Sequence, residues 1–572
     1  MRIARLGRYG VARVGGFLSA REAEQGHEKG ISMSNRCLEM SCLVSLMVCG
    51  FAPLASAQWS PNPATNLPIC NAGGDQVQPK IANAPSGETI VSWYDNRVGG
   101  FDVYAQRLDD SGTPLWTPNG VLVQDRAVSS TEDYGLDVDA TGNALLAYGI
   151  VNFSSLGLQK ISPAGALLWG PTGIVLSTPG GSHSPKIAAT TDGSYVAAWS
   201  EGAVLGINLQ KFDANGNSLW GPVVYTDPPT SRNLFICDLH ASDNGSVIVL
   251  WFRCAGSGCA TSAHHLYTQK YDSSGVPVWN GGVPVILFNG SSTANGYFPT
   301  FLSDGNGGAV YGWYETGGSQ LCFLQRINAA GTEVYAHNGV ACTTATAGRM
   351  RISAAPGFDA ATGDMYMGWA EVTLPTQNMW GVRAQKVSSA GVLQWGGEGV
   401  SIKPLDGNQV SFVRANTLLG GCVVAWQDAT GALTGLVKSS RLDSSGAAVW
   451  PGSPITPCTR NTGKSRLDMN IDDCGMSKLI WSDGASGSQD MLAQNVRADG
   501  TLGPLLSTPL GDMNCDADVT ATDIPLFVDA LINPSAYLVA QPCCLLMRAD
   551  MNADTQLDGN DCQGFVNALL TP

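Results

Sequence analysis

Apolar strands and polar turns alternate in a repeating pattern over residues 58–508. Each repeat contains an apolar run that ends in an aromatic residue and is often followed by an acid, as in IVSWYD, YVAAWSE and CVVAWQD. The aromatic positions are 51 to 62 residues apart. They are Trp93, Tyr148, Trp199, Trp251, Trp313, Trp369, Trp426 and Trp481. A period of this length predicts a repeat architecture.

A second pair of apolar runs follows in each repeat, separated by a turn rich in Asp, Ser and Gly. In five repeats, a Gln on the first run precedes a Trp on the second by ten residues: Gln106/Trp116, Gln159/Trp169, Gln210/Trp220, Gln269/Trp279 and Gln385/Trp395. Because Gly and Asp tolerate the backbone of tight turns, two such runs predict a β-hairpin. Each repeat is therefore expected to form four short strands.

Eight repeats of four strands predict a mainly β fold, an eight-bladed β-propeller over residues 58–508, with a seven-bladed ring as the alternative. The segment WSPNPATNLPICNAGGDQVQPKIA aligns with WGPTGIVLSTPGGSHSPKIA, which places Trp59 where a fourth-strand Trp belongs. The last repeat, LAQNVRADGTLGPLL, lacks that Trp. We therefore expect the N-terminal segment to supply the outer strand of the last blade and to close the ring.

Residues 1–57 have the pattern of an export signal. An apolar run over residues 42–54 is followed by Ala55-Ser56-Ala57, the small residues that a signal peptidase needs. The preceding 32 residues are long and mixed in charge, so Met33 is an alternative start. The run is too short to cross a bilayer, and no later run is longer, so no membrane span is predicted. We expect a secreted or cell-surface protein.

The charge of the chain is strongly negative, at −15 overall. Such a surface repels nucleic acid. Thirteen cysteines follow the signal region, and in an exported protein the pairs Cys254/Cys259, Cys322/Cys342 and Cys458/Cys474 are candidate disulfides, although spacing leaves the connectivity open. Zinc is disfavoured because the sequence has no C-x-x-C pair and its few histidines are scattered.

The acidic C-terminus contains one twelve-residue pattern twice, as DMNCDADVTATD and DMNADTQLDGND, each followed by an apolar helical pattern. Calcium loops of this length supply oxygen ligands from positions 1, 3, 5, 7, 9 and 12. These positions hold Asp512, Asn514, Asp516, Asp518, Thr520 and Asp523 in the first loop, and Asp550, Asn552, Asp554, Gln556, Asp558 and Asp561 in the second. The pattern predicts two bound calcium ions.

The duplicated EF-hand-like loop and helix resemble the type I dockerin family over about residues 511–570. The resemblance implies a small all-α module at residues 511–572 that binds calcium and attaches an exported protein to a cohesin-like partner. The extra cysteines Cys515, Cys543, Cys544 and Cys562 are similar to those of a variant found at the C-terminus of large exported bacterial proteins.

Two departures from the dockerin pattern weaken what it implies. Position 6, usually Gly for a sharp turn, is Ala517 in the first loop and Thr555 in the second, which predicts a lower calcium affinity. Positions 10 and 11, often a Ser-Thr pair that touches cohesin, are Ala521-Thr522 and Gly559-Asn560. The metal is therefore better supported than the partner.

The repeats also carry acids directly after their aromatic strands, namely Asp95, Glu201, Glu315, Glu371 and Asp428. Because they recur at one blade position, a structural role is favoured and no catalytic residue is assigned. Two functions remain. The favoured one is an exported binding or scaffolding protein; the alternative is a secreted carbohydrate-active enzyme, a hydrolase of O-glycosyl bonds. The enzyme needs two carboxylates within about 10 Å of each other in one deep pocket. With either function, the ligand of the propeller could be a polysaccharide or a cell-surface molecule.

Overall fold

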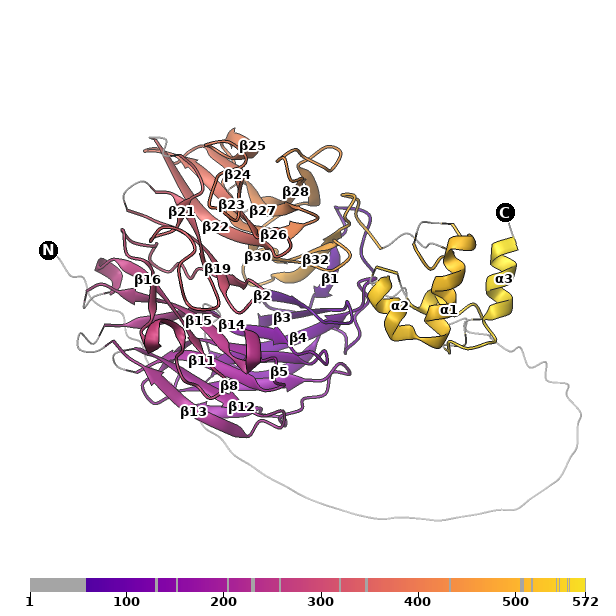
Figure 1. The fold of residues 1–572 in the computed structure, drawn as a ribbon, viewed down its shortest axis with the longest axis horizontal. Helices are drawn as coiled ribbons and strands as arrows, with labels where there is room; N and C mark the ends of the chain where they lie inside the picture. Colours follow the sequence, from indigo (N-terminus) through magenta and orange to yellow (C-terminus); the bar gives the residue numbers. More distant parts are fainter. Residues whose placement is uncertain are drawn as a thin grey trace, which may run out of the picture. The chain divides into compact units, whose positions relative to one another are not determined.

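The computed structural model describes residues 58–570 apart from short gaps at 129–131, 151–152, 203–204, 228–231, 257–258, 318–319, 345–347, 432–433, 505–508, 516–517, 542, 545, 553 and 555. The predicted export signal lies outside these residues. The chain folds into eight four-stranded antiparallel sheets, followed by three short helices (Figure 1). The expected eight-bladed β-propeller is confirmed.

The blades follow one another along the chain, and seven of them are four consecutive strands ordered from the ring centre outwards. The strands are β2 (Gln76–Asn83), β3 (Thr89–Asp95), β4 (Phe101–Leu108), β5 (Val121–Val128); β6 (Gly135–Val138), β7 (Ala144–Ile150), β8 (Ser155–Ile161), β9 (Ile174–Ser177); β10 (Ser182–Ala189), β11 (Tyr195–Glu201), β12 (Gly206–Phe212), β13 (Ser218–Tyr225); β14 (Leu234–Ala241), β15 (Val247–Cys254), β16 (His264–Tyr271), β17 (Val285–Phe288); β18 (Phe301–Ser303), β19 (Ala309–Tyr314), β20 (Cys322–Ile327), β21 (Val340–Ala341); β22 (Arg349–Asp359), β23 (Asp364–Thr373), β24 (Trp380–Val387), β25 (Val400–Asp406); β26 (Val410–Leu418), β27 (Gly421–Gly431), β28 (Thr434–Leu442), β29 (Ile455–Thr462). The inner strands contact one another in sequence around the ring.

The eighth blade is built from both ends of the propeller sequence. Its strands β30 (Lys464–Ile471), β31 (Ser477–Asp483) and β32 (Asp490–Val496) are completed by β1 (Leu67–Cys70), which pairs antiparallel with β32. Trp59 is buried, and its indole N–H donates to the carbonyl of Asp110 in the first blade at 2.9 Å. The expected closure of the ring by the N-terminal segment is confirmed.

In most outer hairpins that carry them, the Gln and the Trp tie one blade to the next. The side-chain carbonyl of Gln106 accepts the backbone N–H of Trp116 at 3.0 Å, which explains the spacing of ten residues. The Trp116 indole then donates to the carbonyl of Pro163 in the second blade at 2.8 Å. Trp279 and Trp395 reach into their following blades in the same way. The repeated sequence pattern is therefore a repeated contact between blades.

The aromatic residue of each inner hairpin forms the core between its blade and the preceding one. Trp93 is fully buried against Ile480 and Met491 of the eighth blade, and Trp481 is fully buried among side chains of the seventh. Burying an aromatic ring of this size stabilises a fold by roughly 2 to 3 kcal/mol. These cores hold the inner strands at a fixed radius around the channel.

The disulfides follow the predictions only in part. Cys254 and Cys259 are bonded, as predicted. Cys322 and Cys342 are buried neighbours on β20 and after β21 but carry free thiols. Cys458 and Cys474 form no disulfide with each other, because one lies on the outer strand β29 of the seventh blade and the other in the hairpin turn between β30 and β31. Nearness in sequence was misleading for that pair.

The C-terminal module contains α1 (Ile524–Ile532), α2 (Pro534–Ala540) and α3 (Cys562–Leu570), with short 3-10 turns at Ala521–Asp523 and Leu546–Ala549. Helices α1 and α3 follow the two acidic loops, as the apolar patterns predict. The rings of Phe527 and Phe565 stack at 3.9 Å between centroids and form the middle of a small core. Across the described residues, no helix combines the length and the apolar character needed to cross a membrane.

Candidate functional site

The first acidic loop is organised around the carboxylate of Asp523, its twelfth residue. Asp523 is fully buried, and its Oδ1 accepts the backbone N–H groups of Met513 at 2.7 Å and Asn514 at 3.0 Å. Its Oδ2 accepts the N–H of Thr520 at 2.8 Å. These bonds close the loop on itself and begin the turn that leads into α1.

The second loop repeats this arrangement position by position. Asp561 is fully buried, and its Oδ1 accepts the backbone N–H groups of Met551 at 2.8 Å and Asn552 at 3.3 Å, while its Oδ2 accepts that of Asp558 at 3.0 Å. In both loops the acceptor is residue 12, and the donors are residues 2, 3 and 9. The two loops therefore share a backbone conformation as well as a sequence pattern.

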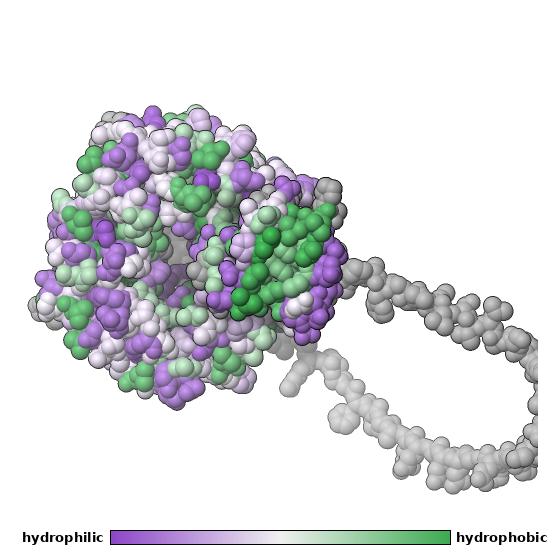
Figure 2. Space-filling model, turned by 45° about the vertical axis from the view of Figure 1, so that its right-hand side comes forward, coloured by the Kyte–Doolittle hydropathy of each residue, from purple (hydrophilic) through white to green (hydrophobic). Residues whose placement is uncertain are grey.

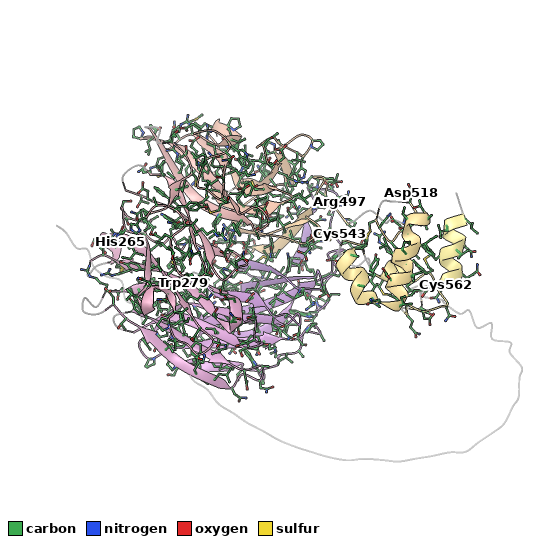
Figure 3. All side chains as sticks on the ribbon, in the orientation of Figure 1. His265, Trp279, Arg497, Asp518, Cys543 and Cys562 are labelled. Atoms are coloured by element: carbon green, nitrogen blue, oxygen red, sulfur yellow. A yellow bond between two sulfur atoms is a disulfide. The ribbon has the colours of Figure 1, made fainter. Side chains whose placement is uncertain are left out.

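The remaining predicted ligands divide into buried and solvent-facing positions. Asp512 and Asp550, the first residues of the loops, are buried, and the guanidinium of Arg548 lies 4.0 Å from a carboxylate oxygen of Asp512. Asn514 and Asp558 are half-buried, whereas Asp518, Thr520, Asn552, Asp554 and Gln556 face solvent (Figure 3 labels Asp518).

Four positions of these loops lie outside the described residues, namely Asp516, Ala517, Ala553 and Thr555. Within the described part of the chain, no three acidic, His or Cys side chains are grouped closely enough to hold a metal ion. The structure therefore places eleven of the twelve predicted ligands in two matching loops, but it does not gather their side chains around a point.

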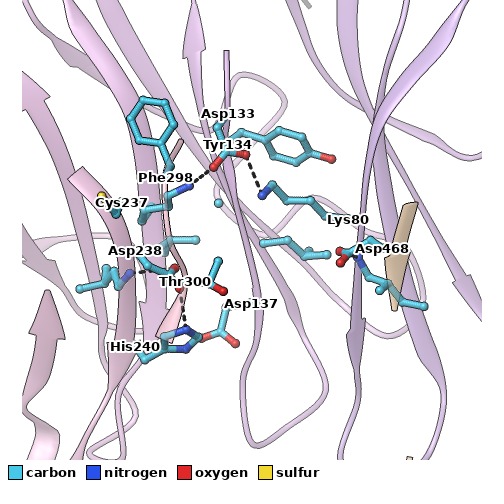
Figure 4. A pocket seen from close by; sticks show the side chains of 16 residues that line it. Lys80, Asp133, Tyr134, Asp137, Cys237, Asp238, His240, Phe298, Thr300 and Asp468 are labelled. Atoms are coloured by element: carbon cyan, nitrogen blue, oxygen red, sulfur yellow. Dashed lines mark hydrogen bonds and ion pairs between the residues drawn. The ribbon is translucent and has the colours of Figure 1, made fainter. Parts of the chain in front are cut away.

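A second candidate site lies among the inner strands of the propeller, where the sequence predicts none. A cavity of about 180 Å³ opens between them, and its charged side chains are Lys80, Asp133, Asp137, Lys186, Asp238, His240 and Asp468 (Figure 4). They come from β2, β6, β10, β14 and β30 and from the residues just before β6. Apart from the ring, nothing in the sequence brings them together.

Two lysines share one carboxylate on one side of this cavity. The ammonium of Lys80 lies 2.8 Å from Asp133, and that of Lys186 forms an ion pair with the same carboxylate. Burial alone would raise the pKa of Asp133, but the two lysines hold it far below its usual range. Asp133 likewise raises the pKa of the Lys186 ammonium against the opposite effect of burial. Asp133 and Lys186 are therefore both charged at neutral pH.

Another side of the cavity carries a histidine between two acids. The Nε2 atom of His240 lies 3.1 Å from Asp238, and the pKa of His240 is raised by this carboxylate although burial opposes the shift. Asp137 faces the same imidazole (Figure 4). Its two carboxylate oxygens accept the backbone N–H groups of Val138 and Ala189 at 2.8 Å each, yet burial raises its pKa.

Several inner strands share a backbone irregularity, and on β2, β10 and β30 it precedes a residue that lines the cavity. Five of them contain a β-bulge, marked by a shift in strand register, with a non-glycine residue at positive φ: Gln78 (57°), Ser184 (48°), Ser353 (54°), Phe412 (50°) and Arg466 (57°). Two residues after each stand Lys80, Lys186, Ala355, Arg414 and Asp468. The bulges thus set the direction of the side chains around the channel.

The acids that recur after the aromatic strands do not line this cavity. Asp95 and Glu201 accept the indole N–H of the Trp two residues earlier, at 3.0 and 2.7 Å, and Glu371 pairs with Arg349 and Arg383 at 3.0 and 2.9 Å. These contacts agree with the structural role favoured by their spacing. Only two cavity residues, Lys80 and Lys186, had a sequence signal, namely the Lys shared by QPKIA and SPKIA, a motif that we interpreted only as evidence of ring closure.

No protein-family model matches this chain, and no curated protein does. Among solved structures, it is similar to a protein of unknown function from Dyadobacter fermentans (11% identity, 76% of this chain and 98% of that one, TM-score 0.36). It is also similar to an ulvan lyase (11%, 68% and 97%, 0.39) and to an alpha-L-arabinanase from Penicillium chrysogenum (15%, 56% and 98%, 0.32). The function therefore has to be argued from the chain's own residues.

Proposed function

We propose that this protein is an exported binding or scaffolding protein whose C-terminal module binds two calcium ions and attaches it to a protein partner. The observation that carries the proposal is the matched pair of loops, in which buried Asp523 and Asp561 accept the backbone N–H groups of the same three loop positions. If these loops were ordinary Asp-rich turns, there would be no reason for the same hydrogen-bond pattern, followed by a helix, to occur twice.

The donor set of the loops suits calcium. All twelve predicted ligands offer oxygen, which a hard divalent cation prefers, and each loop supplies the six positions that such a site uses. A carboxylate has about four lone-pair sites, so Asp523 and Asp561 can hold the backbone and still bind a cation. Bound calcium would offset the mutual repulsion of the acids. The buried residues 1 and 12 would anchor it, and the solvent-facing residues between them would turn inward.

An apolar stripe on the module supports attachment to a partner. Ile524, Val528 and Ile532 follow one another at four-residue spacing on α1 and are 44%, 44% and 76% exposed. Val566 and Leu570 on α3 have the same four-residue spacing and are 46% and 77% exposed. Figure 2 shows apolar side chains gathered in a patch with a hydrophilic rim. Exposed apolar patches of this kind mark interaction surfaces, and the dockerin resemblance implies a cohesin-like partner.

Calorimetric titration of the full chain tests the metal directly. We expect two calcium ions per chain, and one fewer in each of Asp523→Asn and Asp561→Asn. Asp529→Asn, on α1 outside the loops, is the matched control and should retain both. If millimolar calcium gives no heat with the wild type, the proposal fails. Attachment is tested with an immobilised cohesin domain, which should retain the wild type in calcium but release Val528→Asp.

A carbohydrate-active enzyme is a second candidate, favoured by one observation. The cavity collects four carboxylates, Asp133, Asp137, Asp238 and Asp468, whereas this function requires at least two in one pocket. Asp137, with a raised pKa, would serve as the acid that protonates a leaving oxygen. Release of reducing ends from a panel of polysaccharides, abolished in Asp137→Asn, is the expected result. Cleavage by that variant at the wild-type rate would exclude the assignment.

A further inference from the structure

We propose that the central cavity of the propeller binds one neutral saccharide unit, either a free monosaccharide or the end of a chain. The proposal rests on the second function above, because it names the class of ligand for the same cavity. It requires binding only, so it also holds if no bond is cleaved.

The charges of the cavity are almost balanced, which favours a neutral ligand. Lys80 and Lys186 share Asp133, Asp468 lies 3.1 Å from Arg414, and Asp238 pairs with His240. Asp137 has no ion-pair partner among the described residues. A strongly charged ligand would therefore meet little net opposite charge. It would also leave some of the buried polar groups without a partner, which is costly.

The same side chains offer many hydrogen bonds of both kinds. Carboxylates only accept, ammonium groups only donate, and the imidazole does either, depending on its tautomer. Sugar hydroxyl groups donate and accept, so a saccharide can meet both kinds at once. The side chain of His240 is 43% exposed and Phe298 lines the cavity beside these polar groups, adding an apolar surface for the C–H faces of a ring. The chemistry of the wall is that of a polyol site.

The strained backbone of the inner strands supports a functional role for the side chains that line the cavity. A non-glycine residue at positive φ costs of order 1 kcal/mol or more, and such strain is usually retained where it serves a site. Here it occurs in five inner strands, and the residues two positions later include Lys80, Lys186 and Asp468 of the cavity. Ordinary blade packing does not need the bulge in every blade, since β6 and β18 pair without a register shift.

The volume limits the ligand to about one ring. A cavity of about 180 Å³ has the room of roughly six water molecules. One sugar ring is of this size, whereas the middle of a polysaccharide chain would need a groove open at both ends. The expected ligand is therefore a terminal unit or a free sugar.

Ligand-observed NMR followed by calorimetry on the full chain tests this inference. The probes are glucose, galactose, arabinose and rhamnose, their β-linked disaccharides, and glucuronate and glucosamine as charged counterparts. We expect at least one neutral sugar to bind, and Asp137→Asn and His240→Gln each to weaken it by about tenfold or more. A disaccharide that binds better than its monosaccharide identifies a chain end as the ligand.

Asp364→Asn is the matched control, because Asp364 has an exposure similar to that of Asp238 and forms a comparable ion pair with Lys386 at 2.9 Å outside the cavity. It should bind sugar like the wild type. Thr300 also lines the cavity and offers a hydroxyl group. If Asp137→Asn fails to fold, His240→Gln and Thr300→Val carry the test. The inference is overturned if no neutral sugar binds, if a charged one is preferred, or if the cavity variants bind normally. Sugar binding without cleavage removes the enzyme function alone. Cleavage of a polysaccharide by cavity variants that also bind sugar like the wild type removes the inference, because the sugar would then bind elsewhere.

Discussion

The propeller and the C-terminal module differ in what their buried side chains do. In the ring, Trp93, Trp251 and the equivalent residues of the other blades fill a continuous series of apolar cores. In the module, one small core centred on Phe527 and Phe565 is flanked by fully buried carboxylates that accept backbone N–H groups. The ring is stabilised by the amount of apolar surface that it buries, and the module by a few polar constraints.

This difference indicates how each part should respond to a perturbation. A large apolar core is insensitive to one lost polar contact but depends on every blade being complete. A module of about sixty residues buries too little surface to be stable by that means alone, so disulfides and metal ions become decisive. We therefore expect two unfolding transitions in the full chain that can be shifted separately.

The largest expected effect is the opening of the ring. Leu67 and Ile69 on β1 are both 2% exposed, and replacing both with Ala should cost about 4 to 8 kcal/mol through lost burial and cavities. Thermal unfolding followed by near-ultraviolet circular dichroism should show the propeller transition lowered and the module transition unchanged. Val98→Ala, at a site that is 75% exposed, is the control. A double variant that melts like the wild type would show that β1 does not close the ring.

Loss of a disulfide should destabilise the C-terminal module more than the propeller, the reverse of the effect expected from opening the ring. Cys515 and Cys544 are 29 residues apart, so their bond removes about 3 to 4 kcal/mol of loop entropy from the unfolded chain, whereas Cys254 and Cys259, 5 residues apart, contribute about 2 kcal/mol. The double Ala variant of the first pair should abolish the module transition in guanidinium, and that of the second should move the propeller transition only slightly. If the two double variants shifted their transitions by equal amounts, the module would not depend on its disulfide more than the propeller does.

Calcium should act on the module alone. A ligand at ten times its dissociation constant stabilises the folded form by about 1.4 kcal/mol per site, so two calcium ions contribute about 3 kcal/mol. A chelator should therefore lower the module transition by this amount and leave the propeller transition in place, with Asp561→Asn showing about half the effect. Magnesium at the same concentration is the control. A chelator that shifts the propeller transition instead would place the metal in the ring.

The parts of this structure that could be predicted from sequence are those encoded by a local pattern. Trp93 and its equivalents, the Gln106/Trp116 pair and the missing Trp of the last repeat fixed the blades and their closure, because each blade contacts only its neighbours. The acidic loops could be predicted equally well, since residues 1 to 12 of each loop are contiguous in the sequence. In both cases a repeated local signal determined the arrangement.

The central cavity could not be predicted, because its residues are far apart in sequence and meet only around the closed ring. Lys80, Asp238 and Asp468 come from three different blades. The bulges that direct them depend on the backbone of Gln78 and Ser184, which are not residue types that mark positive φ. Helix α2 was also missed, because its first residue, Pro534, suggests a turn until Asn533 is seen to cap the N–H of Ala536.

The smallest expected effect concerns a carboxyl group in the ring that behaves unlike those of the module. Glu132 is 9% exposed, its Oε1 accepts the N–H of Ser184 at 2.9 Å, and its Oε2 has no hydrogen-bond partner within the described residues. Burial raises its pKa to about 7, with a further increase from Asp133 and opposing effects from the Ser184 N–H, Arg126 and Lys186. The folded protein therefore prefers the neutral acid, whereas the unfolded chain ionises near 4.5.

Because the pKa of Glu132 is higher in the folded than in the unfolded protein, this group removes stability as the pH rises from about 4.5 through 7. The amide of Glu132→Gln resembles the neutral acid at every pH. We expect this variant to differ from the wild type by less than about 1 kcal/mol at pH 5 and to be more stable by about 1 to 3 kcal/mol at pH 8, in the propeller transition alone. Denaturant unfolding at both pH values measures the difference. A gain of the same size at pH 5 would attribute it to packing, and a shift of the module transition would mean that the two parts do not unfold independently.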